Sequence, residues 1–137
     1  MVDTRFTVSL QILVTLAFHA DELMNSIQLA KVLKTNPTFV RKLTAVLTEA
    51  GLIESFRGKN GGIRLARKPQ EIGLDEIYCV STYEKPLICT PKKSATKACK
   101  VSCSMDAIFC DISKGIEKAT QGHLSKMRLS DIVKKVD

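Results

Sequence analysis

A glycine-rich basic segment organises this sequence, and it reads Ile53-Glu54-Ser55-Phe56-Arg57-Gly58-Lys59-Asn60-Gly61-Gly62-Ile63-Arg64-Leu65-Ala66. Both ends carry apolar and β-branched residues, which are typical of short strands, and three glycines lie between them. Two such runs separated by a glycine-containing turn indicate a β-hairpin. The glycines can adopt positive φ or let the backbone approach another group closely. We therefore expect strands over residues 52–56 and 63–66, joined by a tight turn.

Two short helices are predicted just before this hairpin. Asn25 or Ser26 can cap the first helix, whose apolar residues are expected to pack inward: Ile27, Ala30, Val32 and Leu33. Asn36 followed by Pro37 is a strong start signal for the second helix. The reason is that Asn accepts hydrogen bonds from the first amides, and proline at the first helical position loses none. Gly51 ends this second helix.

The second helix has two chemically different faces. One face is apolar and should pack inward: Val40, Leu43, Val46, Leu47 and Ala50. The opposite face carries small and basic side chains: Thr38, Arg41, Lys42, Ala45 and Thr48. Two short helices followed by a hairpin are typical of a winged helix-turn-helix, in which the second helix enters the major groove of DNA. The hairpin is then the wing, whose tip would reach along the minor groove.

Positive charge is concentrated on the same elements. No acidic residue occurs between residues 23 and 48, and that stretch contains four basic residues: Lys31, Lys34, Arg41 and Lys42. The stretch 55–70 also lacks acids and contains five basic residues: Arg57, Lys59, Arg64, Arg67 and Lys68. The formal net charge of the 137-residue chain is +7, which favours polyanionic partners. We predict contacts to double-stranded DNA from Asn36, Thr38, Arg41, Lys42, Arg57, Lys59, Asn60 and Gly61.

Neither a membrane span nor a signal peptide is indicated. The longest apolar stretch, residues 12–20, is interrupted by Thr15 and His19 and is far shorter than a bilayer span. Asp3 and Arg5, which precede it, do not form the basic region of a signal peptide. Residues 5–20 instead have the spacing of a first helix with one buried stripe. We therefore expect a cytoplasmic protein without a membrane partner.

Further helices are predicted over residues 72–80 and 129–136, and a long one over about 104–121. The long helix carries an apolar stripe at heptad-like steps: Val101, Met105, Ile108, Ile112, Ile116 and Ala119. Such a stripe needs a partner, and a second copy of the chain is the simplest one. The alternative is that the stripe packs onto the chain's own first helix. We predict a homodimer whose interface contains Met105, Ile108, Ile112 and Ile116.

Taken together, these features resemble the Rrf2 family of bacterial transcription regulators. The matching segments are residues 5–7, 36–41, 51–53, 57–58 with 61–62, and 129–132. The most specific of them is the glycine-rich wing in its place directly after the recognition helix. The resemblance implies a mainly α fold with a small β-hairpin wing and a long dimerisation helix. It also implies a homodimer that binds operator DNA, with Arg57 entering the minor groove.

The family resemblance also draws attention to the cysteines. Cluster-bearing members hold an iron–sulfur centre through three cysteines spaced near C-x5-C-x5-C, whereas Cys89, Cys99 and Cys103 of this chain are spaced C-x9-C-x3-C. Cys103 stands in the place of the third ligand. Asp106 stands where some members carry a histidine ligand, and Val8 stands where others supply an aspartate, so neither known fourth ligand is present. The resemblance thus implies residues 1–73 as a DNA-binding domain and residues 74–137 as a region with a sensor loop, over 82–100, and the dimerisation helix.

Three interpretations of the cysteines stay open. Soft thiolates of Cys89, Cys99 and Cys103 could hold an iron–sulfur cluster. Alternatively, Cys99 and Cys103 could act as redox-sensing thiols, because nearby lysines favour the thiolate. In the third interpretation the cysteines are small buried residues without a role, as expected for Cys79 and Cys110. Structural zinc is disfavoured, because the chain has no C-x-x-C pair.

The leading functional hypothesis is a sequence-specific transcription regulator that responds to redox or iron–sulfur status. A thiol or iron–sulfur enzyme is the first alternative, but neither of the two histidines lies near a cysteine in sequence, and no acid–base pair or nucleophile motif is evident. A non-specific nucleic-acid-binding protein is the second alternative. Five phenylalanines and two tyrosines are too few and too scattered for base-stacking platforms, so duplex reading is favoured and no enzyme activity is expected.

Overall fold

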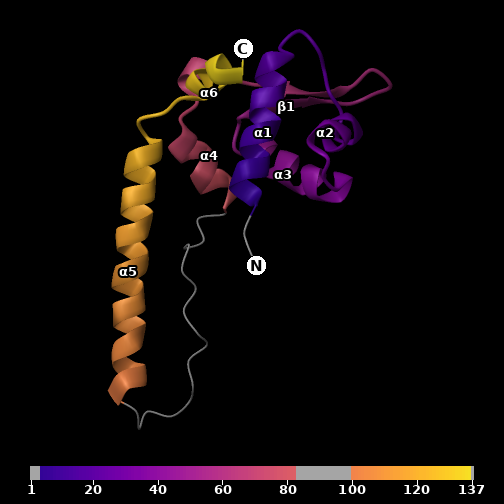
Figure 1. Cartoon of the computed structure of the whole chain (residues 1–137). Coiled ribbons are helices and arrows are strands. Elements are labelled where there is room, and N and C mark those ends of the chain that lie inside the picture. Colours follow the sequence, from indigo (N-terminus) through magenta and orange to yellow (C-terminus); the bar gives the residue numbers. More distant parts are fainter. Residues whose placement is uncertain (1–3, 83–99, 137) are drawn as a thin grey trace.

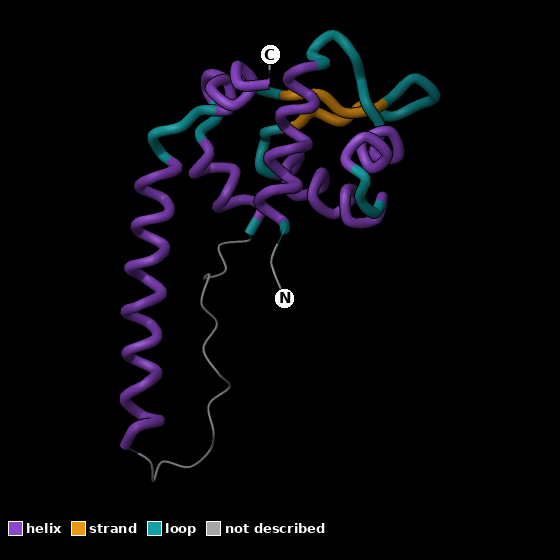
Figure 2. Tube along the Cα trace, viewed as in Figure 1, coloured by secondary structure: helices purple, strands orange, loops and turns teal. Residues whose placement is uncertain are grey.

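The computed structural model describes residues 4–82 and 100–136. Helices α1 to α4, the hairpin and α6 form one body, from which the long helix α5 extends (Figures 1 and 2). This arrangement confirms the predicted mainly helical fold with a single small hairpin among the described residues. The elements in chain order are α1 (Arg5–Phe18), α2 (Ser26–Leu33), α3 (Pro37–Glu49), β1 (Ile53–Phe56), β2 (Gly62–Leu65), a short 3-10 helix η1 (Pro69–Glu71), α4 (Leu74–Ser81), α5 (Lys100–Leu124) and α6 (Leu129–Val136).

Side-chain caps fix where α2 and α3 begin. Asn25 Oδ1 accepts a hydrogen bond from the Gln28 amide at 2.8 Å, and Gln28 Oε1 accepts one from the Asn25 amide at 2.9 Å. This reciprocal pair is a capping box, which satisfies two amides that the helix leaves unpaired. Asn36 Oδ1 likewise accepts from the Thr38 amide at 2.7 Å. Both predicted start signals are therefore confirmed, and Gly51, with φ of 81°, ends α3 as expected.

One hydrophobic core connects α1, α2, α3, α4 and α6. Because these side chains come from both halves of the sequence, the hairpin and the short helices are held against a common interior. α6 begins at Leu129, which is fully buried, and so seals the end of this core. The residues whose side chains are almost completely buried include Ile12, Leu13, Leu16, Leu29, Val40, Leu43, Leu47, Leu52, Ile72, Ile77 and Leu129.

The inward face predicted for α2 is wrong at two positions. The exposed fractions of Ile27 and Val32 are 61% and 58%, whereas Leu29, which was not predicted to be buried, is completely buried beside Ala30. The physical reason is that apolar residues occupy most of the circumference of this eight-residue helix, so their spacing singles out no face. Packing against α1 and α3 selects the face that carries Leu29 and Ala30.

The face predicted for α3 is largely confirmed. Val40, Leu43 and Leu47 are completely or almost completely buried, as expected. The exception is Ala50, which is exposed because α3 ends at Glu49 and Ala50 is its C-cap. A similar small shift occurs in α1, which ends at Phe18 rather than at residue 20.

Helix α5 is held to the body through α4. The Tyr78 hydroxyl donates a hydrogen bond to Glu117 Oε1 at 3.2 Å, and Gln121 Nε2 donates one to the Cys79 sulfur at 3.3 Å. Glu117 and Gln121 are one helical turn apart, so both contacts lie on one face of the C-terminal part of α5. The N-terminal part of α5 extends beyond the body (Figure 1).

The apolar stripe of α5 is not used within the single chain. Val101, Ile108 and Ile112 have exposed fractions of 65%, 45% and 46%, and Met105 and Ile116 are half-buried. Because α5 packs mainly against α4, the stripe does not pack onto α1, and that alternative is wrong. An exposed apolar stripe of this kind on a long helix is a surface that association would cover.

The burial difference within α2 gives a direct test of the fold. Leu29→Ala should lower the free energy of unfolding by about 2–5 kcal/mol, because it removes a completely buried side chain and leaves a cavity. Val32→Ala, on the exposed side of the same helix, should change it by less than about 0.5 kcal/mol. Urea denaturation followed by circular dichroism measures both. Equal losses from the two substitutions would contradict the packing of α2.

Candidate nucleic-acid interface

The outer face of α3 presents small and basic side chains to the surface. Thr38, Arg41, Lys42 and Ala45 are all exposed, as the sequence predicted. Thr48 is half-buried, and its hydroxyl donates a hydrogen bond to the carbonyl oxygen of Thr44 at 2.6 Å. The exposed set therefore lies toward the N-terminal part of α3, which is the part of a recognition helix that contacts base edges.

Two predicted contact residues of α3 have structural partners. The Asn36 amide oxygen is occupied by the helix cap, so this side chain fixes the start of α3. Arg41 Nε donates a hydrogen bond to Ser26 Oγ at 3.3 Å, which links α3 to the start of α2. The terminal guanidinium nitrogens of Arg41 have no protein partner within the described part of the chain. Arg41 can therefore be oriented by α2 and still bind an acceptor outside the protein.

The wing is a two-stranded antiparallel hairpin whose turn depends on glycines. β1 and β2 pair in the register Ile53 with Leu65, through to Phe56 with Gly62. Of the three turn glycines that could have adopted positive φ, only Gly58 does, at 114°. Gly61 is needed for space instead, because a Cβ atom there would collide with the carbonyl oxygen of Phe56. The turn therefore needs glycine at position 58 because of the positive φ, and at position 61 because a side chain would not fit.

The root of the wing is attached to the helix-turn-helix by backbone hydrogen bonds. The Met24 amide donates to the Ile63 carbonyl oxygen at 3.2 Å, and the Ile63 amide donates to the Met24 carbonyl oxygen at 2.8 Å. Met24 lies just before α2, so β2 is paired on one edge with β1 and on the other with this segment. The wing and the two short helices are consequently joined at a fixed position.

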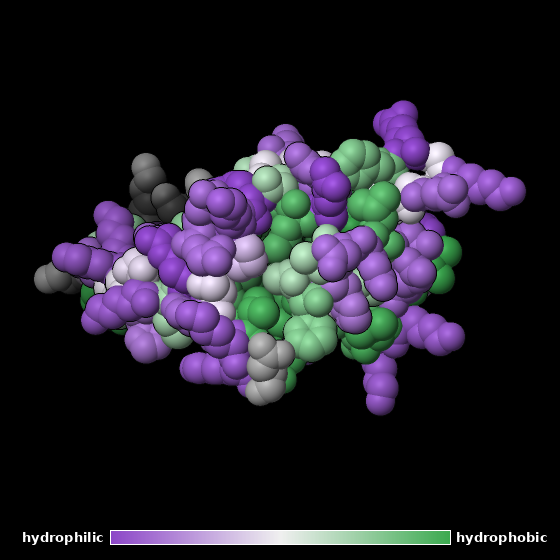
Figure 3. All heavy atoms as spheres, turned by 90° about the horizontal axis from the view of Figure 1, so that it is seen from above, coloured by the Kyte–Doolittle hydropathy of each residue, from purple (hydrophilic) through white to green (hydrophobic). Residues whose placement is uncertain are grey.

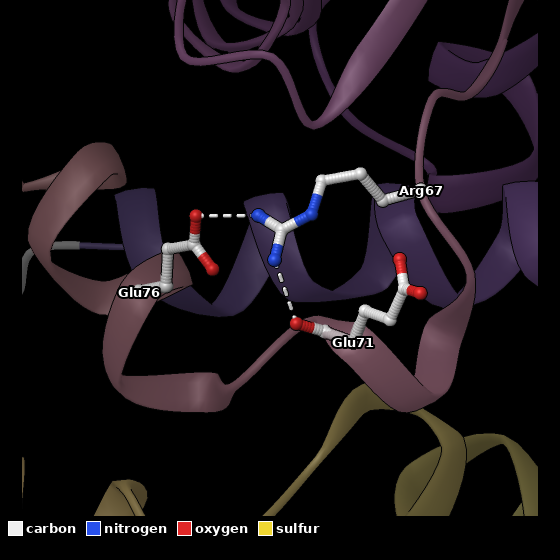
Figure 4. A network of polar contacts seen from close by, with 3 residues as sticks. All are labelled: Arg67, Glu71 and Glu76. Atoms are coloured by element: carbon white, nitrogen blue, oxygen red, sulfur yellow. Dashed lines mark hydrogen bonds and ion pairs between the residues drawn. The ribbon is translucent and has the colours of Figure 1, made fainter.

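Two of the five basic residues of the wing segment are paired within the chain. Arg64 Nε lies 3.2 Å from Glu54 Oε2 on the facing strand, and its guanidinium carbon lies 4.8 Å from the ring centroid of Phe56. Arg67 binds Glu76 of α4 at 2.6 Å and the carbonyl oxygen of Glu71 at 2.7 Å (Figure 4). Both arginines therefore stabilise the hairpin and its junction.

The remaining basic side chains form the candidate interface. Arg57 and Lys59 at the wing tip are exposed, as is Lys68, and they make no ion pair within the described residues. The wing, α2 and α3 lie at the side of the body away from α5 (Figure 1). Long hydrophilic side chains project from this side when the molecule is seen from above (Figure 3). Positive charge on both a helix and a wing suits the phosphates of a duplex.

The structure describes only part of the predicted sensor region. Cys89 and Cys99 lie outside the described residues, as does the side chain of Cys103 on α5. Cys110 is exposed, so its prediction as a small buried residue is wrong, whereas Cys79 is half-buried. The described residues contain no group of three or more histidine, cysteine, aspartate or glutamate side chains that could hold a metal ion. They also contain no helix long and apolar enough to span a membrane.

Sequence reasoning missed the partners of the arginines. Glu54 faces Arg64 in the strand register, so this pair could have been found by aligning the two arms of the hairpin. No comparable signal predicts the contact of Arg67 with Glu76, because it depends on how the 3-10 helix turns the chain after the wing. The bond between Arg41 and Ser26 likewise depends on how α2 and α3 pack.

The arrangement of α2, α3 and a β-hairpin in this order defines a winged helix-turn-helix protein. Residues 2–135 match the model of the Rrf2 family, described as an iron-dependent transcriptional regulator. The chain therefore belongs to the Rrf2 family.

Individual relatives agree with this assignment. The HTH-type transcriptional regulator NsrR of Shouchella clausii is 39% identical over 70 residues, which are 50% of this chain and 47% of that protein. The protein rrf2 of Nitratidesulfovibrio vulgaris is 33% identical over 88 residues, or 63% of this chain and 59% of its own. The chain spans about half the length of the first curated relatives it matches. The family and NsrR are named as transcription regulators and not as enzymes, which agrees with the class of protein predicted from the sequence.

Solved structures share this fold. The structure of IscR from T. potens is 25% identical, has a TM-score of 0.66, and is matched over 100% of this chain and 88% of its own. CymR, titled the global cysteine regulator of B. subtilis, is 20% identical with a TM-score of 0.71, over 100% of this chain and 98% of its own. The similarity therefore includes α5 and α6 as well as the winged helix-turn-helix.

Proposed function

We propose that this chain is a homodimeric transcription regulator that binds operator DNA sequence-specifically. The observation that carries the proposal is a surface of exposed basic side chains that make no ion pair within the described residues, on elements joined through Met24 and Ile63: Arg41 and Lys42 of α3, and Arg57 and Lys59 of the wing. In this proposal residues 1–73 make the DNA contacts, and residues 74–137 provide dimerisation and signal input.

The two basic elements would contact different grooves. Thr38, Arg41 and Lys42 lie on the exposed face of α3, where they would reach base edges and phosphates in the major groove. Arg57, Lys59 and Asn60 lie at the exposed tip of the wing, where they would reach into the minor groove. Gly61 keeps this tip narrow, because a side chain there would collide with the backbone of Phe56.

Dimerisation would place two of these DNA-binding surfaces, each made of α3 and the wing, in one molecule. The apolar stripe of α5 is exposed in the single chain, with Val101, Ile108 and Ile112 along one side of a 25-residue helix. Pairing of two α5 helices would remove this stripe from water. A two-fold dimer would then bind two half-sites of an operator, as is common for helix-turn-helix proteins.

We also propose that the state of Cys89, Cys99 and Cys103 sets the affinity for DNA. The support is their clustering in sequence next to α5, together with the description of the family as iron-dependent. Cysteine thiolates can be oxidised or can ligate iron–sulfur centres. A change at this segment would act on α5, the helix that would fix the distance between the two DNA-binding surfaces of a dimer.

Arg57→Ala should weaken binding to a duplex that the wild-type protein selects from a randomised pool, by roughly 1 to 3 kcal/mol, because it removes a charge from the groove. Lys134→Ala is the matched control, since it removes one positive charge from α6 instead. Fluorescence anisotropy at several salt concentrations measures both, and wild-type affinity should fall steeply as salt rises. Equal losses would contradict the wing assignment. Failure of the wild type to enrich any sequence would favour a non-specific binder.

Ile112→Asp should yield folded monomers with much reduced operator affinity. Ile112 is 46% exposed in the single chain, so the substitution costs the fold little but places an unpaired charge in the apolar seam of a dimer. Sedimentation measures the oligomeric state, and circular dichroism checks the fold. Lys114→Asp is the control, because two helical positions place residue 114 about 200° around α5 from Ile112. A wild type that sediments as a monomer at micromolar concentration would refute the interface.

Changing the state of the cysteines should change DNA affinity by about tenfold, equivalent to about 1.4 kcal/mol of differential stabilisation. The measurement is titration of the selected duplex with reduced, peroxide-treated and iron–sulfur-reconstituted protein. The Cys99→Ser, Cys103→Ser double variant is the control and should not respond. Equal binding by all four preparations would show that the signal enters elsewhere.

A further inference from the structure

We infer that Arg67 and Glu76 are positioning residues, which hold the wing at the angle needed for DNA binding by fastening its root to α4. This inference rests on the proposed function. It assigns Arg67 a role different from that of the phosphate-binding residue its charge suggests, and it gives a role to an acidic residue outside the basic surface.

Both terminal nitrogens of the Arg67 guanidinium group donate a hydrogen bond within the chain. Nη1 donates to Glu76 Oε1 at 2.6 Å, and Nη2 donates to the Glu71 carbonyl oxygen at 2.7 Å (Figure 4). The side chains of Arg67 and Glu76 are 36% and 38% exposed. These two bonds use two of the five guanidinium N–H donors, and together they fix the orientation of the planar group between α4 and the backbone of Glu71.

Arg67 lies where the wing needs an attachment. β2 ends at Leu65, and backbone hydrogen bonds hold the wing root on the side of the helix-turn-helix through Met24 and Ile63. A further bond runs from the Ala66 amide to the Leu52 carbonyl oxygen at 3.0 Å. The bonds of Arg67 add the attachment on the α4 side, at the point where the chain leaves the hairpin.

The same short helix also holds α5. Less than one helical turn beyond Glu76, Tyr78 and Cys79 contact Glu117 and Gln121 of α5. α4 therefore makes both contacts: Glu76 binds the wing attachment, and Tyr78 and Cys79 bind the proposed dimerisation helix. A wing fastened to α4 keeps a defined position relative to α5, and hence to the second wing of a dimer.

Charge and position predict opposite effects of the same substitution, which makes the inference testable. Glu76→Gln removes a negative charge, so general electrostatics predicts tighter binding to DNA. It also removes the charged acceptor of Arg67, so the positioning role predicts weaker binding. Glu71→Gln is a matched control: it makes the same charge change nearby, but Arg67 uses only the backbone oxygen of Glu71.

The experiment measures affinity of full-length protein for the duplex selected by the wild type from a randomised pool. We expect Glu76→Gln to weaken binding about fivefold, the upper range for a partly exposed ion pair, and Glu71→Gln to leave it unchanged or tighter. Arg67→Lys keeps the charge but loses the fork, and should weaken binding like Glu76→Gln. Equal tightening by Glu76→Gln and Glu71→Gln would overturn the inference.

A second measurement separates this inference from the proposed function and from loss of folding. Hydrogen exchange of DNA-free protein should show faster exchange of the β2 amides in Glu76→Gln and Arg67→Lys, with core amides of α1 unchanged. Unchanged β2 exchange would overturn the inference even if DNA binding fell. If the wild type selects no DNA sequence, the proposed function fails, and the exchange data alone decide whether Arg67 holds the wing.

Discussion

The burial of one face of α3 is the contact on which the rest of the structure depends. Val40, Leu43 and Leu47 belong to the same buried core as Leu13 and Leu16 of α1. Removing these side chains from water provides the largest favourable term for placing α3. Once this face is buried, the opposite face of α3 is the one exposed to solvent. Thr38, Arg41 and Lys42 must face solvent, and the chemistry of the interface follows from the packing of the opposite side.

The wing is positioned by a different kind of force. Its strands are only four residues long, too short for an isolated hairpin to be stable. It gains support from the backbone pairing of Ile63 with Met24, and from the ion pair of Arg67 with Glu76. Basic residues in this segment therefore divide into two groups. Arg64 and Arg67 hold the structure, whereas Arg57, Lys59 and Lys68 are exposed and make no ion pair within the described residues.

Helix α4 joins the two ends of the molecule. It buries Ile77 and Tyr78 in the core, and the Tyr78 ring packs edge-on against Phe6 of α1 at 5.6 Å between centroids. The same tyrosine donates to Glu117 of α5 through its hydroxyl. Tyr78 thus links α5 to the core, because its ring packs in the interior and its hydroxyl group binds α5. Together with the bond from Gln121 to Cys79, this contact attaches the C-terminal part of α5 to α4.

Elements whose signals are local could be predicted from the residues alone. Asn36 with Pro37 marked the start of α3, Gly51 marked its end, and Leu129 to Val136 was recognised as the last helix. Caps and turns are encoded within a few residues, because the hydrogen bonds or φ angles involved are those of neighbouring positions. The charge of the candidate interface was also evident, since a run without acids needs no fold to be seen.

Which side chains contact one another, by contrast, depends on how the elements pack in three dimensions. In α2 the choice between Leu29 and Val32 as the buried residue came from packing on α1 and α3, because apolar residues surround the helix. The pairing of Arg67 with Glu76 likewise required the turn at η1. Contacts between distant residues depend on how whole elements pack, and the sequence pattern of a single element carries no information about its neighbours' positions.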